Sequence, residues 1–214
     1  MIATKTYLKI FIPALFIVLL ALIIRVIQYE PQFPKFPPPE QRELTIPIYA
    51  DDPIIGNKKA VHTIIVFEDI SCANCIEQFN VFQELITAYP NEVKIIWKGL
   101  PINTFPNNTK EAHQYAYCAN KQDEFYPFIQ YAFTNGTNLS TIVLDTIVEE
   151  IADIDEKKLK KCLETEQSVI DAYIAKNEEI AHILGIQTLP ATFIKNKQVV
   201  ASTLDEWKLV LNLR

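Results

Sequence analysis

The chain has 214 residues, 49% of them hydrophobic, and a formal net charge of −6. This length suits one domain of roughly 150 to 180 residues once the termini are discounted. The acidic balance, together with a sequence that has no Arg-rich run, argues against nucleic acid as a partner. The four cysteines form an even number, which permits two pairs but does not prove an oxidising compartment.

Residues 10–27 form an apolar run with one charge, Arg25, near its far end. At about 1.5 Å per residue the run nearly spans a bilayer core, and Arg25 can reach the interface. Because Lys5 and Lys9 precede the run, the positive-inside rule predicts residues 1–9 in the cytoplasm and the rest exported. A cleaved signal peptide is the alternative, but no small-residue cleavage site follows the run. We therefore expect a single-pass transmembrane anchor and a domain in a compartment where disulfides persist.

A proline-rich segment follows the apolar run, with five prolines in residues 31–39. Such a composition favours a semi-rigid polyproline spacer rather than a packed element. We therefore expect a linker over residues 28–49 and a folded domain over residues 50–214.

Residues 61–67 are β-branched, aromatic and nearly all apolar, which is typical of a strand buried on both faces. The sequence then reads Cys72-Ala73-Asn74-Cys75, and apolar residues follow at helical steps until Pro90 ends the pattern. These are Phe79, Phe82, Ile86 and Tyr89. The sequence thus predicts a Cys-x-x-Cys motif where a buried strand turns into a helix.

This placement has a chemical consequence. The two intervening residues, Ala73 and Asn74, span the first helical turn and bring both sulfurs within disulfide reach. The thiol of Cys72 also meets the unpaired N–H groups and the positive dipole end of the helix, which favour its thiolate. A thiolate that attacks, with a second thiol one turn away to release it, is suited to thiol–disulfide exchange.

The rest of the chain predicts a second strand, a helical region and a final hairpin with a helix. The second strand covers residues 93–98. Residues of about 107–184 contain helical patterns over about 110–120, 123–133, 141–152, 155–164 and 166–184, and Gly185 suits the end of the last one. Strands at 191–194 and 198–201 flank a turn, and residues 202–205 open a last helix. The predicted order is β-α-β, a helical block, then β-β-α.

Five stretches of this chain, in the same order, carry a family resemblance. They are Asp51–Gly56 with Ala60; Phe67-x-Asp69-x-x-Cys72-x-x-Cys75; Glu111-Ala112 through Ala116–Ala119; Lys161–Leu163; and Leu184-Gly185-Ile186 with Pro190–Phe193. Over roughly residues 50–212 the chain resembles the DsbA-like family of extracytoplasmic thiol–disulfide oxidoreductases. The resemblance implies an α/β fold of the thioredoxin type with an inserted helical block.

The same resemblance implies roles for individual residues. Cys72 matches the attacking cysteine and Cys75 the resolving one. Pro190 matches the family's cis-proline, so that Leu189 and Pro190 offer backbone groups to an extended substrate; a cis X–Pro bond is uncommon enough to be a retained feature. Some members also have a second disulfide, and with the exported compartment and the even count this favours a structural bond between Cys118 and Cys162.

The chain departs from the family at several positions near the motif. The intervening pair usually contains a proline or an aromatic residue and often a histidine, whereas here it is Ala73-Asn74. Val66 stands where the family commonly has a buried glutamate that helps move the proton of the resolving thiol. Glu68 is close in sequence, but we expect its side chain to point differently. Thr188-Leu189 also replaces the usual pair before the cis-proline, which leaves redox potential and substrate preference open.

Two metal-binding alternatives compete with the redox interpretation. Cys72 and Cys75 can form half of a zinc site completed by Cys118, Cys162 or His113, but zinc pairs normally lie on loops. A copper-carrying domain is the other alternative, although the only methionine is Met1. We expect His62, His113 and His182 to be ordinary, partly exposed residues.

The sequence predicts a membrane-anchored enzyme of the bacterial inner membrane, with its catalytic domain on the periplasmic side. It would exchange the Cys72–Cys75 disulfide with cysteines of exported proteins, most simply as an oxidase, and would need no metal or other cofactor. By resemblance, a quinone-linked membrane partner would reoxidise it. The alternatives are a reductase or isomerase of the same fold, or a redox-inactive module that acts as a chaperone or delivers a metal.

Overall fold

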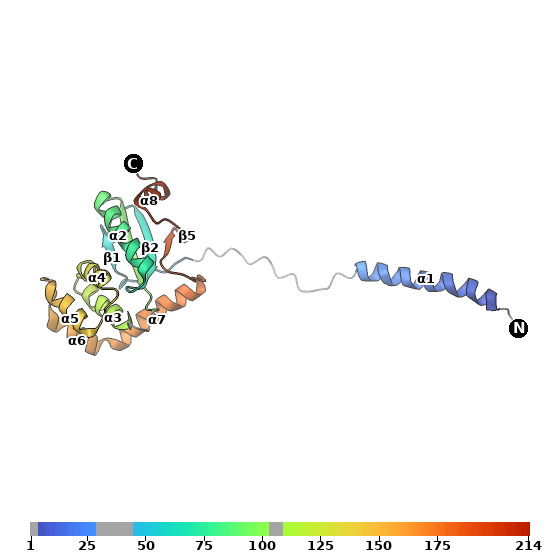
Figure 1. Ribbon diagram of the computed structural model, residues 1–214, viewed down its shortest axis with the longest axis horizontal. Helices are drawn as coiled ribbons and strands as arrows, with labels where there is room; N and C mark the ends of the chain where they lie inside the picture. Colours follow the sequence, from blue (N-terminus) through green and yellow to red (C-terminus); the bar gives the residue numbers. More distant parts are fainter. Residues whose placement is uncertain (1–3, 29–44, 103–108) are drawn as a thin grey trace. The chain divides into compact units, whose positions relative to one another are not determined.

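The computed structural model describes residues 4–28, 45–102 and 109–214, and the chain divides into two compact units, Met1–Arg42 and Glu43–Arg214. The first unit contributes one helix, α1 (Thr4–Gln28), which is drawn in blue in Figure 1. Most of the predicted proline-rich linker, residues 29–44, lies outside the described residues.

The transmembrane prediction needs a correction. Among the helices in the described part of the chain, none combines the length and the apolar character needed to cross a membrane. The predicted anchor over residues 10–27 is therefore wrong, and the cytoplasmic placement of residues 1–9 depended on it.

A five-stranded sheet organises the second unit, with strand order β1-β3-β2-β4-β5. The strands are β1 (Ile54–Gly56), β2 (His62–Glu68), β3 (Val93–Gly99), β4 (Ala191–Ile194) and β5 (Lys197–Val199). β2 and β3 are parallel, and the other pairs are antiparallel. The apolar runs of β2 and β3 suit these central positions, because both faces of the sheet are covered.

Each face of the sheet carries its own apolar core. Side chains alternate along β2, so Ile64 and Val66 join one core, while Ile65 and Phe67 join the other. The first core also contains Cys75 and the helices α2 (Ala73–Ala88) and α8 (Leu204–Leu211), where the rings of Phe82 and Trp207 lie 5.4 Å apart. Thr203 and Glu206 form a capping box that begins α8, which satisfies the N–H groups at its start.

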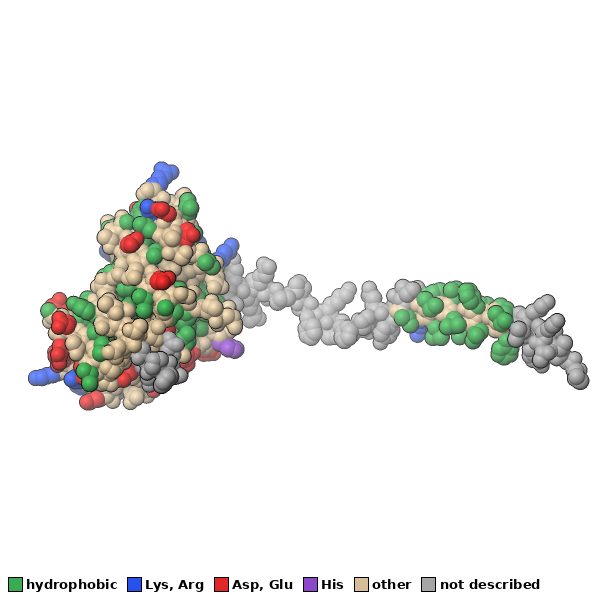
Figure 2. Space-filling view, viewed as in Figure 1, with side chains coloured by type: hydrophobic (Ala, Val, Ile, Leu, Met, Phe, Trp, Pro, Cys, Tyr) green, Lys and Arg blue, Asp and Glu red, His purple; other side chains and the backbone are tan. Residues whose placement is uncertain are grey.

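The helical block lies between β3 and β4 in sequence and gathers at one end of the unit, as Figure 1 shows in yellow to orange. Its helices are α3 (Thr109–Asn120), α4 (Phe125–Thr134), α5 (Thr141–Glu150), α6 (Glu156–Thr165) and α7 (Gln167–Ile183). All five begin and end within two residues of the predicted patterns. Figure 2 shows charged side chains of both signs scattered over the visible face of this unit, since its large apolar side chains pack inside.

The order β-α-β, helical block, β-β-α is the thioredoxin-like arrangement that the sequence predicted, and that part of the fold prediction is confirmed. The differences are small. β5 ends at Val199 rather than at Ala201, and the N-terminal piece Ile54–Gly56 is a true strand, paired with β3.

Candidate active site

The two cysteines of the motif lie where β2 passes into α2. Cys72 is the N-cap residue of α2, with extended backbone dihedrals, and its sulfur accepts a hydrogen bond from the backbone N–H of Cys75 at 3.3 Å. Cys72 is partly exposed, whereas Cys75 is fully buried in the first core. One sulfur of the pair is therefore open to a partner, and the other is shielded.

The same geometry separates the acidities of the two thiols. A hydrogen bond from the Cys75 thiol, helped by the backbone N–H groups of Cys75 and Asn74, lowers the pKa of Cys72 to about 7. Because the Cys75 thiol donates its proton to this hydrogen bond with Cys72, its own pKa is raised. Burial and the nearby Glu68 carboxylate raise the pKa of Cys75 further. Near neutral pH, Cys72 is thus a nucleophilic thiolate in a large fraction of molecules, while Cys75 keeps its proton.

The loop before β4 faces the exposed sulfur. The Leu189–Pro190 peptide bond is cis. The carbonyl oxygen of Leu189 lies 3.8 Å from the Cys72 sulfur, within hydrogen-bond distance for a thiol. The structure therefore brings together Cys72, Cys75, Leu189 and Pro190 at one site, with Ala73 and Asn74 exposed beside it.

Glu68 is the residue near the site that the sequence interpretation misplaced. It ends β2 two residues after Val66, and because side chains alternate along a strand it shares the Val66 face, the face of Cys75. The expectation that it would point differently is therefore wrong. Counting the two-residue period from Val66 would have found this placement.

The Glu68 carboxylate is fully buried and only half satisfied. One oxygen accepts a hydrogen bond from the indole N–H of Trp97 at 3.1 Å, and the other has no hydrogen-bond partner among the described residues. Burial raises the pKa of Glu68 well above its usual value, partly offset by the Trp97 bond, and a charge on Cys72 raises it further. This carboxyl group is consequently an acid that can hold a proton beside the cysteines.

Asp69 holds the turn before the motif. Its carboxylate accepts hydrogen bonds from the backbone N–H of Ser71 (3.3 Å), the backbone N–H of Ile102 (2.8 Å) and the Thr109 hydroxyl (3.1 Å). Its carbonyl oxygen accepts the N–H of Cys72 at 3.1 Å. One side chain thus ties the cysteine turn to the segment after β3 and to the start of α3.

His113 is buried rather than partly exposed, which corrects the sequence expectation. Its ring stacks on Trp97 with centroids 5.1 Å apart, and its Nε2 lies 3.5 Å from the Asp69 carboxylate. The fit depends on Gly99, because a Cβ there would lie 2.4 Å from His113 Nδ1. His62 is partly exposed and His182 exposed, as predicted.

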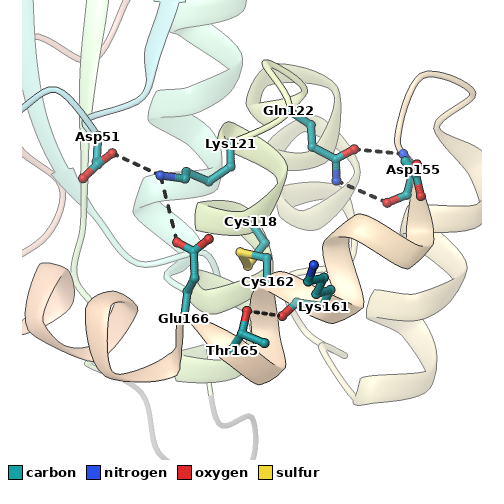
Figure 3. Close-up of a disulfide and its surroundings, with 9 residues drawn as sticks. All are labelled: Asp51, Cys118, Lys121, Gln122, Asp155, Lys161, Cys162, Thr165 and Glu166. Atoms are coloured by element: carbon teal, nitrogen blue, oxygen red, sulfur yellow. Dashed lines mark hydrogen bonds and ion pairs between the residues drawn. A yellow bond between two sulfur atoms is a disulfide. The ribbon is translucent and has the colours of Figure 1, made fainter.

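The other two cysteines are joined in a disulfide within the helical block. Cys118 of α3 and Cys162 of α6 are bonded, with Cα atoms 5.9 Å apart (Figure 3). Nearby, Lys121 lies between the carboxylates of Asp51 (3.8 Å) and Glu166 (4.0 Å). Because their sulfurs are bonded to each other, Cys118 and Cys162 are not free to complete a zinc site. Among the described residues, no three His, Cys, Asp or Glu side chains are arranged to hold a metal.

Comparisons with known proteins agree with this fold and motif. A family model described as thioredoxin matches residues 49–212. The solved structures that resemble the chain include α-DsbA2, a thiol–disulfide exchange protein from Wolbachia pipientis, with 21% identity, a TM-score of 0.67 and coverage of 76% of this chain and 87% of that one. A comparison with curated proteins finds no match.

Two further solved structures resemble the chain. The catalytic domain of Proteus mirabilis ScsC has 24% identity, a TM-score of 0.64 and coverage of 77% and 89%. A periplasmic thioredoxin-like protein from Salmonella enterica serovar Typhimurium has 20% identity, a TM-score of 0.59 and coverage of 76% and 88%. At these identities the solved structures show a shared fold only. The family is identified by the family model that matches residues 49–212. The chain therefore belongs to the thioredoxin family.

Proposed function

We propose that this protein works outside the cytoplasm and exchanges a Cys72–Cys75 disulfide with cysteines of exported proteins, with oxidation of the substrate as its main direction. The observation that carries the proposal is the contrast between two thiols one helical turn apart. Cys72 is partly exposed with a pKa of about 7, whereas the pKa of buried Cys75 is raised.

The exchange proceeds in two balanced steps. A substrate thiolate attacks the Cys72 sulfur of the oxidised enzyme; the Cys72–Cys75 bond breaks, and the Cys75 sulfur leaves as a thiolate that takes up a proton. A second substrate thiolate then attacks the substrate sulfur of the mixed disulfide, and Cys72 leaves as a thiolate. Two electrons pass from the substrate dithiol to the enzyme, and the lowered pKa makes Cys72 a good leaving group.

Glu68 is placed to support the proton transfer at Cys75. Its carboxyl group lies on the strand face of Cys75 and raises the pKa of that thiol, and burial raises its own pKa well above the usual value, which favours the protonated form. In the family this role belongs to a glutamate at the position of Val66. We assign it here to Glu68, two residues along the same face of β2.

The direction of exchange depends on the reduction potential. A cysteine pKa near 7 is thioredoxin-like, whereas strong oxidants of this fold have values near 3.5 and potentials near −120 mV. The Cys72 value of about 7 therefore supports a milder potential, between about −270 mV and −120 mV. It also favours a second candidate function, that of a disulfide reductase or isomerase with the same two cysteines.

The extracytoplasmic location is supported by the Cys118–Cys162 disulfide, because such bonds persist in oxidising compartments. A similar structure is described as periplasmic. In that location the oxidase would be returned to its disulfide form by a quinone-linked membrane partner.

The test is to equilibrate the purified protein in glutathione buffers, trap free thiols and read the mass of the trapped species. We expect the Cys72 and Cys75 thiols to be oxidised together, at a reduction potential between about −270 mV and about −120 mV. A value at or above −120 mV would contradict the milder potential, and a value at or below −270 mV would assign the reductase role. A Cys72–Cys75 pair that never forms a disulfide would contradict the proposed function itself.

A further inference from the structure

A groove runs away from the active site between α2 and the chain that follows β5. It encloses about 530 Å³. Its lining begins at Asn74 and at Leu189-Pro190, and it continues past the end of β5 to Ser202. Because the carbonyl oxygen of Leu189 also faces the Cys72 sulfur, one end of this groove opens at the reactive atom.

The groove has a firm floor. In the amide orientation that satisfies both neighbours, the Gln78 side chain donates a hydrogen bond to the carbonyl oxygen of Ala201 (2.8 Å) and accepts one from the Trp207 indole (3.0 Å). The Thr192 hydroxyl donates to the carbonyl oxygen of Val199 at 2.5 Å. These bonds tie α2 to α8 and to the segment after β5, and β4 to the end of β5, so the groove is held in shape before a ligand arrives.

The open edge of the sheet adjoins this groove. β5 pairs with β4 on one side and is the edge strand of the sheet formed by the described residues. An edge strand and a cis-proline loop both present backbone groups that an extended peptide can meet. Shape and backbone chemistry therefore suit an extended segment of a protein substrate.

Charge then selects among such segments. The lining is otherwise uncharged, with amide, hydroxyl and aliphatic side chains, and it carries one ionisable residue, Glu77. Glu77 lies exposed on α2, and its carboxylate makes no hydrogen bond or ion pair with the other described residues. An unpaired carboxylate in a groove that leads to the nucleophile attracts a cationic side chain of whatever lies there.

We propose that the groove binds the substrate segment around the reacting cysteine and prefers a Lys or Arg about two residues from it, paired with Glu77. This rests on the proposed function. The spacing follows from geometry: five helical residues from Cys72 to Glu77 rise about 7.5 Å, and two residues of an extended chain span about 6.6 Å. The preference is a property of one side chain, separate from the general attraction of an acidic protein for cations.

The test uses peptides that contain two cysteines and a variable residue two positions from the first one. With Arg at that position we expect the oxidised protein to react about three-fold faster than with Ser at low ionic strength, and more slowly with Glu. Added salt should shrink the difference, because the pair is exposed. Arg on the N-terminal and C-terminal sides of the cysteine should differ, since a bound segment has one direction.

A matched pair of variants separates the groove from the overall charge. Glu77→Gln should bring the Arg-to-Ser rate ratio close to one. Glu84→Gln removes the same charge from an exposed site on the same face of α2, about 10.5 Å further along, and should keep the ratio.

The outcomes are distinct. Equal ratios in the wild type and both variants, or an equal loss in both variants, would overturn the preference, as would an Arg five residues away that works equally well. Failure of the Ser peptide to react at all would instead overturn the proposed function, since that peptide tests exchange without the charge.

Discussion

The two cysteine pairs of this protein differ in almost every respect that governs thiol chemistry. Cys72 and Cys75 are three positions apart at a helix start, unbonded, and unequal in exposure and acidity. Cys118 and Cys162 are 44 positions apart, bonded, and buried between two helices. A helix N-terminus stabilises a thiolate and so keeps a disulfide exchangeable, whereas a buried bond between packed helices gives an attacking thiolate little access.

The largest expected effect comes from the exchangeable pair. Cys72→Ser should abolish exchange with a dithiol peptide, because no other described thiol is both free and exposed. Cys75→Ser, mixed with a peptide disulfide, should instead accumulate a mixed disulfide: the Cys72 thiolate attacks one peptide sulfur, the other peptide sulfur leaves as a thiolate, and no Cys75 thiol remains to resolve the bond. Mass spectrometry under non-reducing conditions checks both variants. A mixed disulfide formed equally well by Cys72→Ser would reverse the assigned roles.

The buried pair should affect stability and leave exchange unchanged. Replacing both Cys118 and Cys162 by Ala removes a closed loop of about 45 residues, which the chain-entropy model values at about 4 kcal/mol. Urea unfolding should show this loss of unfolding free energy, while the rate of dithiol oxidation stays at the wild-type value.

Selective reduction compares the two pairs within one molecule. The fully oxidised protein should present no free thiol, and mild reductant should expose two, at Cys72 and Cys75, before it opens the second bond. Alkylation of Cys118 and Cys162 while Cys72 and Cys75 remain bonded would contradict the comparison.

Glu68 connects the exchangeable pair to pH. Its folded-state pKa is raised above the unfolded value, so its contribution to stability is complete below about pH 4.5 and is lost as pH rises toward the folded-state pKa. Glu68→Gln should remove this loss, which amounts to at most about 1.4 kcal/mol per pH unit. Relative to the wild type, the variant should therefore gain stability between pH 5 and pH 8.

Urea unfolding at the two pH values measures this difference. Glu84→Gln is the control, because Glu84 lies exposed on α2 and should leave the pH dependence unchanged. The same Glu68 variant should slow the release of Cys75 in exchange, which a merely structural carboxylate would not do. An unchanged pH dependence of stability together with an unchanged exchange rate would remove Glu68 from the mechanism.

Local patterns of the sequence predicted most of the fold, because period, capping residues and prolines act over a few positions. The passage from buried strand to helix at Cys72 and the start of α8 at Thr203 are of this kind. What failed depended on the packing of distant segments. His113 is buried because Gly99 leaves room for its ring against Trp97, and no neighbour in sequence indicates this.

The anchor prediction failed for a different reason. It relied on the composition of residues 10–27 alone, whereas no helix in the described part of the chain has both the length and the apolar character needed to cross a membrane. The Glu68 error was avoidable, since it required only that alternation be counted from Val66. The groove beside Glu77 could not be predicted, because it is formed by α2 and by the segment after β5, more than one hundred residues later.

The smallest expected effect tests the reason for the milder reduction potential that we propose for the Cys72–Cys75 pair. The intervening residues Ala73 and Asn74 provide no cation, so the Cys72 thiolate relies on the Cys75 thiol, the backbone N–H groups and the helix end. Asn74→His places a histidine in the first turn of α2, where its protonated ring can stabilise that thiolate further. If the pKa of Cys72 falls by one unit, the reduced form gains at most about 1.4 kcal/mol, which raises the potential by at most about 30 mV. Glutathione equilibration at pH 6 and pH 8 measures the shift, which should be larger at pH 6, where more of the histidine is charged.

Asn74→Gln is the matched control, because it changes the size of the side chain without adding charge and should leave the potential near the wild-type value. An equal shift in both variants would assign the effect to packing in the first turn rather than to charge.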